Sequence, residues 1–367
     1  MTTIAILGAG VMASALTFPL ADNGHDVRLV GTHLDAEIVD RVRATGVHPG
    51  LGRRLPEPVR AYQLEQIEAA FDGAEVVMSG VNSFGVGWAG QRIAPLLTPD
   101  TLVIAIAKGM AASDQGDLRI LPDVLAEQAP PELRSRIPWA AIAGPSIAGE
   151  VAARRHTCVV FSGLEQWALE RLAATFRTGW YHVWTSTDLV GVEVCAAMKN
   201  CYALGVGFAQ GVLDRLGEAD SPDRNHNYEA ALFGQATVEI GQMVRTLGGR
   251  PDTPYGLAGV GDLYVTSTGG RNVRVGRLVG SGLRFSDARA GMGGITLEGA
   301  AAIGVIGGAL PKLTDRGVVG PADLPLMRHL HAVVAQDRPP QLPWSAFFGG
   351  EARPETPVTP ADADQPG

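Results

Sequence analysis

The chain has 367 residues, of which 46% are hydrophobic, and a formal net charge of −8. This length and apolar content suffice for a large core, most naturally divided between two domains, and exclude a disordered or fibrous protein. The acidic balance argues against a nucleic-acid-binding protein, because binding to a phosphate backbone requires a dense basic surface. A small anionic ligand needs only a local cationic pocket.

The sequence carries no signal for secretion or membrane insertion. A strand-like run, Thr3 to Leu7, begins almost at the first residue, and no run of eighteen apolar residues is present that would span a bilayer. The cysteines, Cys158, Cys195 and Cys201, lack the spacing of a zinc site, and their odd number is a poor basis for disulfides. We therefore expect a cytoplasmic protein with reduced thiols, no metal site and no stable membrane insertion.

The first half of the chain predicts a sheet wound with helices. Strand-like runs at 3–8, 26–30, 75–81, 101–107, 138–143, 157–162 and 181–185 alternate with helical segments. This is the pattern of a parallel sheet covered by helices on both faces. After Thr187 helical spacing dominates to about Val334, with breaks at 214–227, 248–262 and 267–272. We expect an α/β, doubly wound domain at 1–187, an all-helical substrate and catalytic domain at 188–337, and a proline-rich, partly disordered tail at 338–367.

A glycine-rich turn directly follows the first predicted strand. Gly8, Gly10 and Ala13 form the G-x-G-x-x-A version of the dinucleotide-binding fingerprint, where a strand gives way to a helix. Gly8 permits the tight turn, and Gly10 lets the backbone approach a pyrophosphate, which then faces the helix starting near Val11 and Met12. The N-terminal domain is therefore predicted to be of the Rossmann type and to bind NAD or NADP.

The end of the second strand does not distinguish the two cofactors. An acid there would bind the ribose hydroxyls of NAD, whereas an arginine would accept the extra phosphate of NADP. Thr32 and His33 stand there instead, and Asp35 follows a little late. His33 suits either cofactor, and it also suits an ordinary exposed loop.

Lysine is rare in this chain. Only Lys108, Lys199 and Lys312 occur, and the other 27 of the 30 basic residues are arginine. Lys199 lies in an apolar helical stretch, where an ammonium group is costly unless it is paired or functional. The ordinary alternative is a lysine that buries its stem and extends its charge to water.

Five further segments resemble the NAD(P)-dependent glycerol-3-phosphate dehydrogenase family, so that the resemblance extends to about residue 335. They are AKG at 107–109, GPSIAGE at 144–150, MKN at 198–200, GLAGVGDL at 256–263 with Thr266 and GRN at 270–272, and LEG at 297–299. The chain departs from the family pattern at Asn82, Ser267 and Gly269–Gly270 and through the divergent segment 214–228. These departures concern the identity of the substrate more than the type of reaction.

The resemblance implies reversible hydride transfer between NAD(P)H and the ketone of dihydroxyacetone phosphate, which yields sn-glycerol 3-phosphate for glycerophospholipid metabolism. It makes Lys199 the proton donor and acceptor, with Asp262 and Lys108 as further catalytic residues. The substrate residues that it implies are Lys108, Gly144, Ser146, Asn200, Asp262, Thr266, Arg271 and Asn272. The cofactor residues are Gly8, Gly10, Val11, Met12, Ala13, His33, Phe84, Lys108, Ala148, Arg271 and Glu298. A homodimer is also implied.

Other functions are compatible with these residues. A family member acting on a different phosphorylated or phosphonylated ketone would use the same Lys199, Asp262 and Arg271–Asn272 set. A β-hydroxyacid or ketopantoate type of dehydrogenase shares the order of domains, but recognises a carboxylate, and the GLAGVGD stretch is not its signature. A catalytically silent nicotinamide-binding sensor would keep the fingerprint without needing the proton donor.

Overall fold

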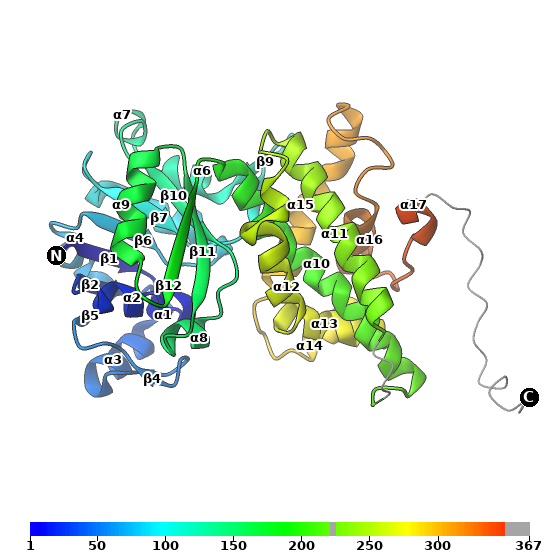
Figure 1. Cartoon of the computed structure of the whole chain (residues 1–367), viewed down its shortest axis with the longest axis horizontal. Helices are drawn as coiled ribbons and strands as arrows, with labels where there is room; N and C mark the ends of the chain where they lie inside the picture. The colour runs from blue at the N-terminus through cyan, green and yellow to red at the C-terminus, as the bar shows by residue number, and fades with distance from the viewer. Residues whose placement is uncertain (221–224, 349–367) are drawn as a thin grey trace, which may run out of the picture.

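The computed structural model describes residues 1–220 and 225–348. These residues form two lobes that lie side by side, one built around a sheet that includes the N-terminus and one built from helices (Figure 1). Arg224, in the divergent segment, and residues 349–367, in which disorder was expected, lie outside the described residues.

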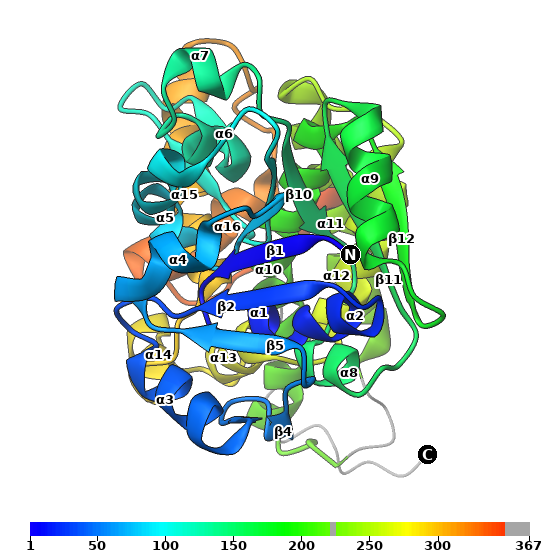
Figure 2. The ribbon, with the colours of Figure 1, turned by 90° about the vertical axis from the view of Figure 1, so that its left-hand side faces the viewer.

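The N-terminal lobe contains an eight-stranded sheet in the order β12-β11-β10-β7-β6-β1-β2-β5 (Figure 2). Its strands are β1 (Thr3–Leu7), β2 (Asp26–Val30), β5 (Val59–Tyr62), β6 (Val76–Ser79), β7 (Leu102–Ala105), β10 (Trp139–Ala143), β11 (Thr157–Gly163) and β12 (Tyr181–Ser186). All seven predicted strands are present. The sequence prediction missed β5, a short edge strand whose residues are only partly buried.

The sheet is mainly parallel, as predicted, but β11 runs antiparallel to β10. The other neighbouring pairs are parallel. The connection from β10 to β11 holds only the short helix α8 (Ala148–Ala152). A parallel neighbour needs a crossover long enough to return the chain to the starting edge, and an antiparallel neighbour does not.

Helices cover both faces of the sheet, as the doubly wound prediction requires. One face packs on α1 (Val11–Ala15), α2 (Thr17–Asp22), α3 (Ala36–Thr45), α8 and α9 (Gln166–Phe176). The other packs on α4 (Ile67–Phe71), α5 (Val86–Ile93) and α6 (Leu121–Ala126). Because β1 lies between β2 and β6, the loops after β1 and β6 diverge, which opens a crevice at the carboxyl ends of the strands.

Shorter elements join these strands and helices. They are the hairpin strands β3 (Val47–His48) and β4 (Arg53–Arg54), the turns η1 (Leu64–Gln66), η2 (Ser83–Gly85) and η3 (Ala94–Leu96), and α7 (Pro131–Arg134). A second hairpin, β8 (Met110–Ala112) with β9 (Leu118–Ile120), extends from the sheet lobe to the helical lobe, where Lys312 Nζ donates to the carbonyl of Asp114 at 2.7 Å. The sequence prediction missed this link between the lobes.

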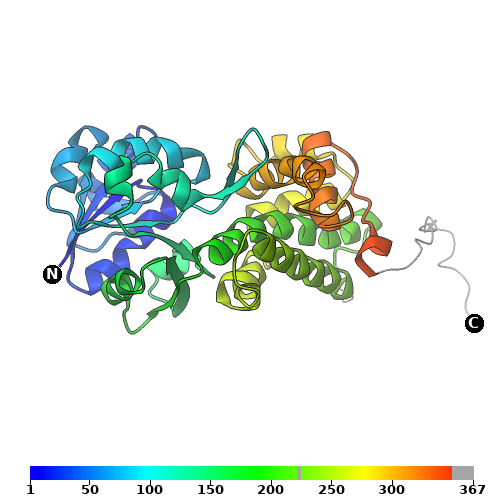
Figure 3. The ribbon, with the colours of Figure 1, turned by 90° about the horizontal axis from the view of Figure 1, so that it is seen from above.

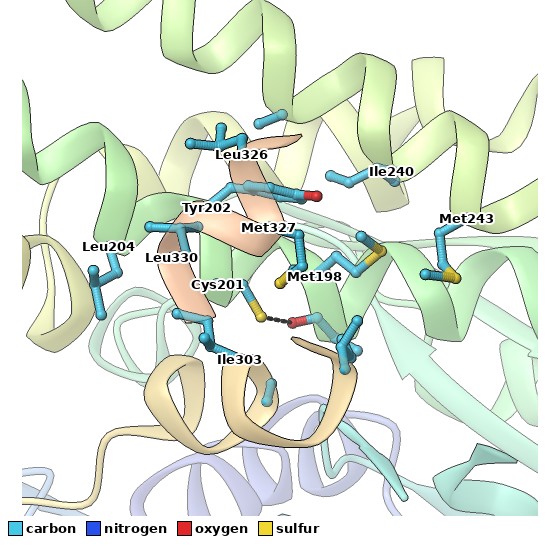
Figure 4. Close-up of a cluster of buried hydrophobic side chains, with 14 of the residues drawn as sticks. Met198, Cys201, Tyr202, Leu204, Ile240, Met243, Ile303, Leu326, Met327 and Leu330 are labelled. Atoms are coloured by element: carbon cyan, nitrogen blue, oxygen red, sulfur yellow. Dashed lines mark hydrogen bonds between the residues drawn. The ribbon is translucent and has the colours of Figure 1, made fainter. Parts of the chain in front are cut away.

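The helical lobe is arranged around α10 (Leu189–Leu216), a helix of 28 residues. Around it lie α11 (His226–Thr246), α12 (Asp262–Ser267), α13 (Arg271–Gly280), α14 (Phe285–Ala290), α15 (Glu298–Asp315) and α16 (Pro325–Gln336) (Figure 3). Met198, Cys201 and Tyr202 of α10 point into a buried cluster with Ile303 and Met327 (Figure 4). Because this core surrounds α10, the helix holds its polar residues in fixed positions.

By length and composition α10 is apolar enough to cross a membrane, although the sequence analysis found no such run. In its most apolar window of eighteen residues, 94% of the residues are buried inside the protein. Burial in a protein core explains the apolar composition, since a helix surrounded by other helices is hydrophobic on all sides.

Three predicted loops are more ordered than expected. The break at 214–227 is narrower, because α10 continues to Leu216 and α11 begins at His226. The break at 248–262 contains η4 (Thr253–Tyr255) and the π-helical turn η5 (Leu257–Gly261). The third break is shorter than predicted, because α12 ends at Ser267 and α13 begins at Arg271. Part of the expected tail forms α17 (Trp344–Phe348), and Trp344 of this helix packs on the helical core together with Leu342, which precedes it. We propose the domain boundary at residues 187–188, between β12 and α10.

Candidate active site

A cleft of about 820 Å³ lies between the two lobes at the carboxyl ends of the central strands. Residues of the sheet lobe form most of its wall, and Lys199, Asn200 and Thr296 are among those that the helical lobe contributes. Every residue predicted to contact the cofactor lies on this wall: Gly8, Gly10, Val11, Met12, Ala13, His33, Phe84, Lys108, Ala148, Arg271 and Glu298. The structure therefore brings together residues that are up to 290 positions apart.

The turn after β1 has the form that a dinucleotide requires. Gly8 has φ of +117°, and a Cβ there would lie 2.7 Å from the carbonyl oxygen of Gly80, so a larger residue would clash with the backbone. Gly10 has open space around it instead, because a Cβ there would have no neighbouring atom within 4 Å. This space lets the backbone of Gly10 approach a pyrophosphate closely.

The end of the cleft near β2 is lined by His33, whose ring meets the ring of Trp88 edge to face at 5.1 Å. Arg92 lies over the same indole ring, with its guanidinium carbon 5.9 Å from the ring centre. Asp35 also lines the cleft, and its Oδ2 accepts hydrogen bonds from the backbone and hydroxyl of Thr32 at 2.9 and 2.8 Å. The rings of His33 and Trp88 suit the adenosine part of either NAD or NADP, whereas Asp35 Oδ2 binds the backbone.

A buried carboxylate binds the two lysines of the site. Asp262 Oδ1 accepts from Lys199 Nζ, and Asp262 Oδ2 accepts from Lys108 Nζ at 2.9 Å. The backbone amide of Gly144 also donates to Asp262 Oδ2, at 3.2 Å, and Lys108 Nζ donates to the carbonyl of Gly144 at 3.3 Å. Asp262 is only 1% exposed. The carboxylate thus joins the ends of β7 and β10 to the middle of α10.

Local geometry explains how Asp262 reaches this position. It begins α12 directly after the π-helical turn η5, which packs against Pro254. A Cβ at Gly259 in that turn would lie 2.0 Å from the carbonyl oxygen of Pro254, so only glycine fits there. The glycine-rich stretch before Asp262 therefore has a packing role in addition to its place in the family motif.

Burial and charge give the two lysines different pKa values. Burial lowers the pKa of Lys199 to about 7, and the positive charge of Lys108 acts in the same direction against the attraction of Asp262. Burial also opposes the charge of Lys108, but the Asp262 carboxylate outweighs it and raises the pKa of Lys108. At neutral pH Lys108 is therefore charged, while both protonation states of Lys199 are populated.

Polar residues beside Lys199 extend the site toward the N-terminal turn of α13. Asn272 Nδ2 donates to Asn200 Oδ1 at 3.3 Å, and Asn272 Oδ1 accepts from the backbone amide of Gly299 at 3.2 Å. Arg271 begins α13 and lines the cleft with its side chain exposed. An always-charged guanidinium at the rim of a cleft is suited to binding a phosphate group.

Four residues predicted to contact substrate do not line the cleft directly. Gly144 and Asp262 adjoin it through Lys108, and Asn272 adjoins it through Asn200. The hydroxyl of Thr266 donates to the carbonyl of Asp262 at 2.7 Å, a bond within α12. Ser146 lies on the wall, where its hydroxyl meets Met12 Sδ at 3.8 Å.

Sequence reasoning missed several residues of the cleft wall, among them Trp88, Thr296 and Val81. Asn82 was noted only as a departure from the family, yet its Oδ1 accepts from the amides of Phe84 and Gly85 at 3.1 and 3.3 Å and so begins the turn η2. A polar cap residue directly after a buried strand was the signal available in the sequence.

The fold and the site define a nicotinamide-nucleotide-dependent dehydrogenase. Family models described as the N-terminus and the C-terminus of NAD-dependent glycerol-3-phosphate dehydrogenase match residues 3–168 and 188–344. The chain belongs to this family.

Relatives and solved structures show the same likeness. The NADP(+)-dependent glycerol-3-phosphate dehydrogenase of Archaeoglobus fulgidus is 37% identical over 285 residues, which cover 78% of this chain and 82% of that protein. The NAD(P)+ glycerol-3-phosphate dehydrogenase of Shouchella clausii is 35% identical over 82% of this chain and 84% of its own. The crystal structure of glycerol-3-phosphate dehydrogenase from Coxiella burnetii has a TM-score of 0.76 at 29% identity and covers 94% of this chain and 97% of its own. A ketopantoate reductase from Ralstonia eutropha, at 19% identity over 91% of this chain and 97% of its own, reaches a TM-score of 0.55, a likeness of fold alone.

Proposed function

We propose that this chain is an NAD(P)-dependent sn-glycerol-3-phosphate dehydrogenase, which interconverts dihydroxyacetone phosphate and sn-glycerol 3-phosphate. The observation that carries the proposal is the Lys199–Asp262–Lys108 cluster on the cleft that also holds the dinucleotide fingerprint. The names of the relatives support the same reaction.

In this proposal Lys199 transfers the proton. When bound, the nicotinamide cofactor supplies or accepts the hydride at the substrate carbon. Lys199 Nζ donates a proton to the oxygen of the ketone during reduction and takes it from the hydroxyl during oxidation. A pKa of about 7 suits both directions, because neither protonation state is rare near neutral pH.

Asp262 and Lys108 act on this proton donor and on the substrate oxygen. Asp262 holds the ammonium of Lys199 in place, and the backbone amide of Gly144 holds Asp262. The charge of Lys108 lowers the pKa of Lys199 and favours negative charge that develops on the substrate oxygen. These electrostatic effects of Asp262 and Lys108 are strong only where water is excluded. The burial of Asp262 and Lys199 provides such a site.

Arg271 and Asn272 are proposed to recognise the phosphate group. Arg271 offers a planar set of donors at the start of α13, and the link from Asn272 to Asn200 and Gly299 fixes this N-terminal turn of the helix. A family member acting on a phosphonylated ketone would use the same residues. The divergent segment 214–228 is the sequence feature that favours testing such a substrate.

We further propose that the protein is a homodimer, as the resemblance implies, and that it is cytoplasmic. A molar mass close to twice that of the chain, measured by light scattering after gel filtration, is the expected result. A mass equal to one chain at micromolar concentration would contradict the dimer without affecting the proposed reaction.

The proposed reaction is tested by following oxidation of NADH and of NADPH with dihydroxyacetone phosphate, beside unphosphorylated dihydroxyacetone as the matched control. Phosphate-dependent turnover is expected, and the better cofactor identifies the preference. Binding of either cofactor without turnover on any phosphorylated or phosphonylated ketone would favour the silent sensor instead.

A further inference from the structure

Two side chains outside the fingerprint hold the peptide groups of Ala9, the middle residue of the turn after β1. Asp35 Oδ2 accepts a hydrogen bond from the amide of Ala9 at 3.1 Å. His48 Nε2 lies 2.8 Å from the carbonyl oxygen of Ala9. We propose that Asp35 and His48 are positioning residues that fix this turn for the pyrophosphate of the cofactor. This inference rests on the proposed function, because it concerns the cofactor site of that dehydrogenase.

His48 is fixed before it reaches Ala9. Its side chain is fully buried, and its Nδ1 accepts from the amide of Leu51 at 3.1 Å. Because Nδ1 accepts, Nε2 carries the proton and donates it to the carbonyl of Ala9. The tip of the hairpin also packs on the fingerprint, since a Cβ at Gly50 would lie 2.8 Å from Cγ2 of Val11. The hairpin β3–β4 therefore packs against the turn after β1 through His48 and Gly50.

Asp35 is fixed in a similar way. Its Oδ2 accepts from the amide and the hydroxyl of Thr32 in addition to the amide of Ala9. The carboxylate thus joins the turn after β2 to the turn after β1. An acid in this region of a dinucleotide site usually binds the ribose. In this chain Asp35 Oδ2 accepts hydrogen bonds from backbone amides instead.

The direction of the Ala9 carbonyl sets the direction of the next amide. In a planar trans peptide the C=O and the following N–H point to opposite sides. Since His48 draws the Ala9 carbonyl away, the amide of Gly10 points away from His48. Gly10 lines the cleft and His48 does not, so this amide faces the space where the pyrophosphate binds. A turn that is fixed beforehand loses little conformational freedom when the ligand binds.

The test compares ADP-ribose, which contains the pyrophosphate and a second ribose, with adenosine, which lacks both, in the absence of any ketone. Dissociation constants for ADP-ribose and for adenosine are measured by displacement of NADH or NADPH fluorescence, with Asp35→Ala and His48→Leu against the wild type. We expect ADP-ribose to bind roughly tenfold more weakly to each variant, as for the loss of one net hydrogen bond to a charged group, while adenosine binding changes less than about twofold. Asp35→Asn and His48→Gln, which keep an acceptor and a donor, should recover most of the affinity.

Asp40→Ala is the matched control, because Asp40 is an exposed acid on α3 whose carboxylate accepts only from Gln63 in the described part of the chain. Equal losses for ADP-ribose and adenosine, or unchanged ADP-ribose affinity in folded variants, would overturn the inference. If His48→Leu does not fold, judged by thermal melting, Asp35→Ala alone decides. Tighter binding by Asp35→Ala would show that the charge of Asp35 only repels the cofactor. A protein that binds ADP-ribose but reduces no ketone would refute the proposed function and leave this inference standing.

Discussion

Lys199 owes its proposed role to burial beside two charges of opposite sign. A lysine on the surface remains protonated at all physiological pH values, whereas burial and Lys108 bring the pKa of Lys199 to about 7. The carboxylate of Asp262 opposes both effects, because it stabilises the charged form of Lys199. The chain uses arginine nearly everywhere else, and arginine does not release its proton in proteins, so lysine is the residue that this position requires.

This pKa predicts opposite pH dependences for the two directions of the reaction. Lys199 is protonated below its pKa, so kcat for ketone reduction should fall as the pH rises through about 7. Oxidation needs the neutral amine, so its kcat should rise over the same range. Steady-state rates in both directions between pH 6 and 9 measure this. Parallel profiles in the two directions would remove Lys199 as the titrating group.

The removal of the amine gives a second prediction. Lys199→Ala should lose roughly 10²–10⁴-fold in kcat, the usual contribution of general acid catalysis, while the dissociation constant of NAD(P)H remains nearly unchanged. Stopped-flow turnover and fluorescence titration measure the two quantities separately. Near-normal turnover by a folded Lys199→Ala protein is incompatible with the proposed role.

Glu193 predicts a pH dependence of stability. It is buried, and neither carboxylate oxygen has a hydrogen-bond partner in the described part of the chain. Burial raises its pKa from an ordinary value of 4.5 to about 8. The folded state therefore binds this proton more tightly than the unfolded state, and stability is lost as the pH rises from 4.5 to 8. Glu193→Gln removes the loss and should raise the free energy of unfolding by roughly 4 kcal/mol at pH 8, with no gain near pH 4. Urea unfolding at both pH values measures the difference, and an equal gain at both would contradict the assignment.

Close packing between α10 and α13 aligns the two helices that carry Lys199 and Arg271. Glycines at 207 and 211 of α10 meet glycines at 276 and 280 of α13, so that the backbones touch. A Cβ at Gly276 would lie 2.0 Å from the carbonyl oxygen of Leu204. The distance between Lys199 and Arg271 therefore depends on glycine at these positions, because a side chain there would push the two helices apart.

Gly276→Ala should lower the free energy of unfolding by roughly 2–3 kcal/mol, because the backbones must separate. The matched control is Gly304→Ala in α15, where a Cβ meets no atom within 4 Å. That change should stabilise the protein by roughly 0.5–1 kcal/mol through helix propensity. Chemical denaturation of both variants tests the pair. Similar effects of the two substitutions would show that the helix crossing tolerates a methyl group.

Sequence patterns predicted the helices and strands better than the strand directions and the contacts between distant segments. The seven strands followed from apolar runs, and the fingerprint followed from glycines next to one another in the chain. The reversal of β11 was not predictable from its apolar pattern, because that pattern is the same in both strand directions. The bonds of His48 and Asp35 to Ala9 were missed for a similar reason, since they join segments 26 and 39 residues apart. Asp262 and Lys108 were predicted as site residues only through the family resemblance, and the contact between them was not predicted.

The whole molecule works as two lobes that supply different parts of one cleft. The sheet lobe provides the fingerprint and Lys108, and the helical lobe provides Lys199, Asp262 and Arg271. Neither lobe alone contains a complete site. The buried Asp262 joins them, because it binds a lysine from each lobe. The proposed reaction therefore requires a substrate that reaches from Lys199 to Arg271, with a ketone at one end and a phosphate at the other.

The most direct test of this claim measures kcat/KM of the wild type and of Arg271→Ala with dihydroxyacetone phosphate and with dihydroxyacetone. We expect the substitution to lower kcat/KM about 10- to 100-fold for the phosphorylated ketone, as for hydrogen bonds to a charged group, and to have little effect on the unphosphorylated one. Equal losses on the two ketones would contradict the placement of the phosphate at Arg271.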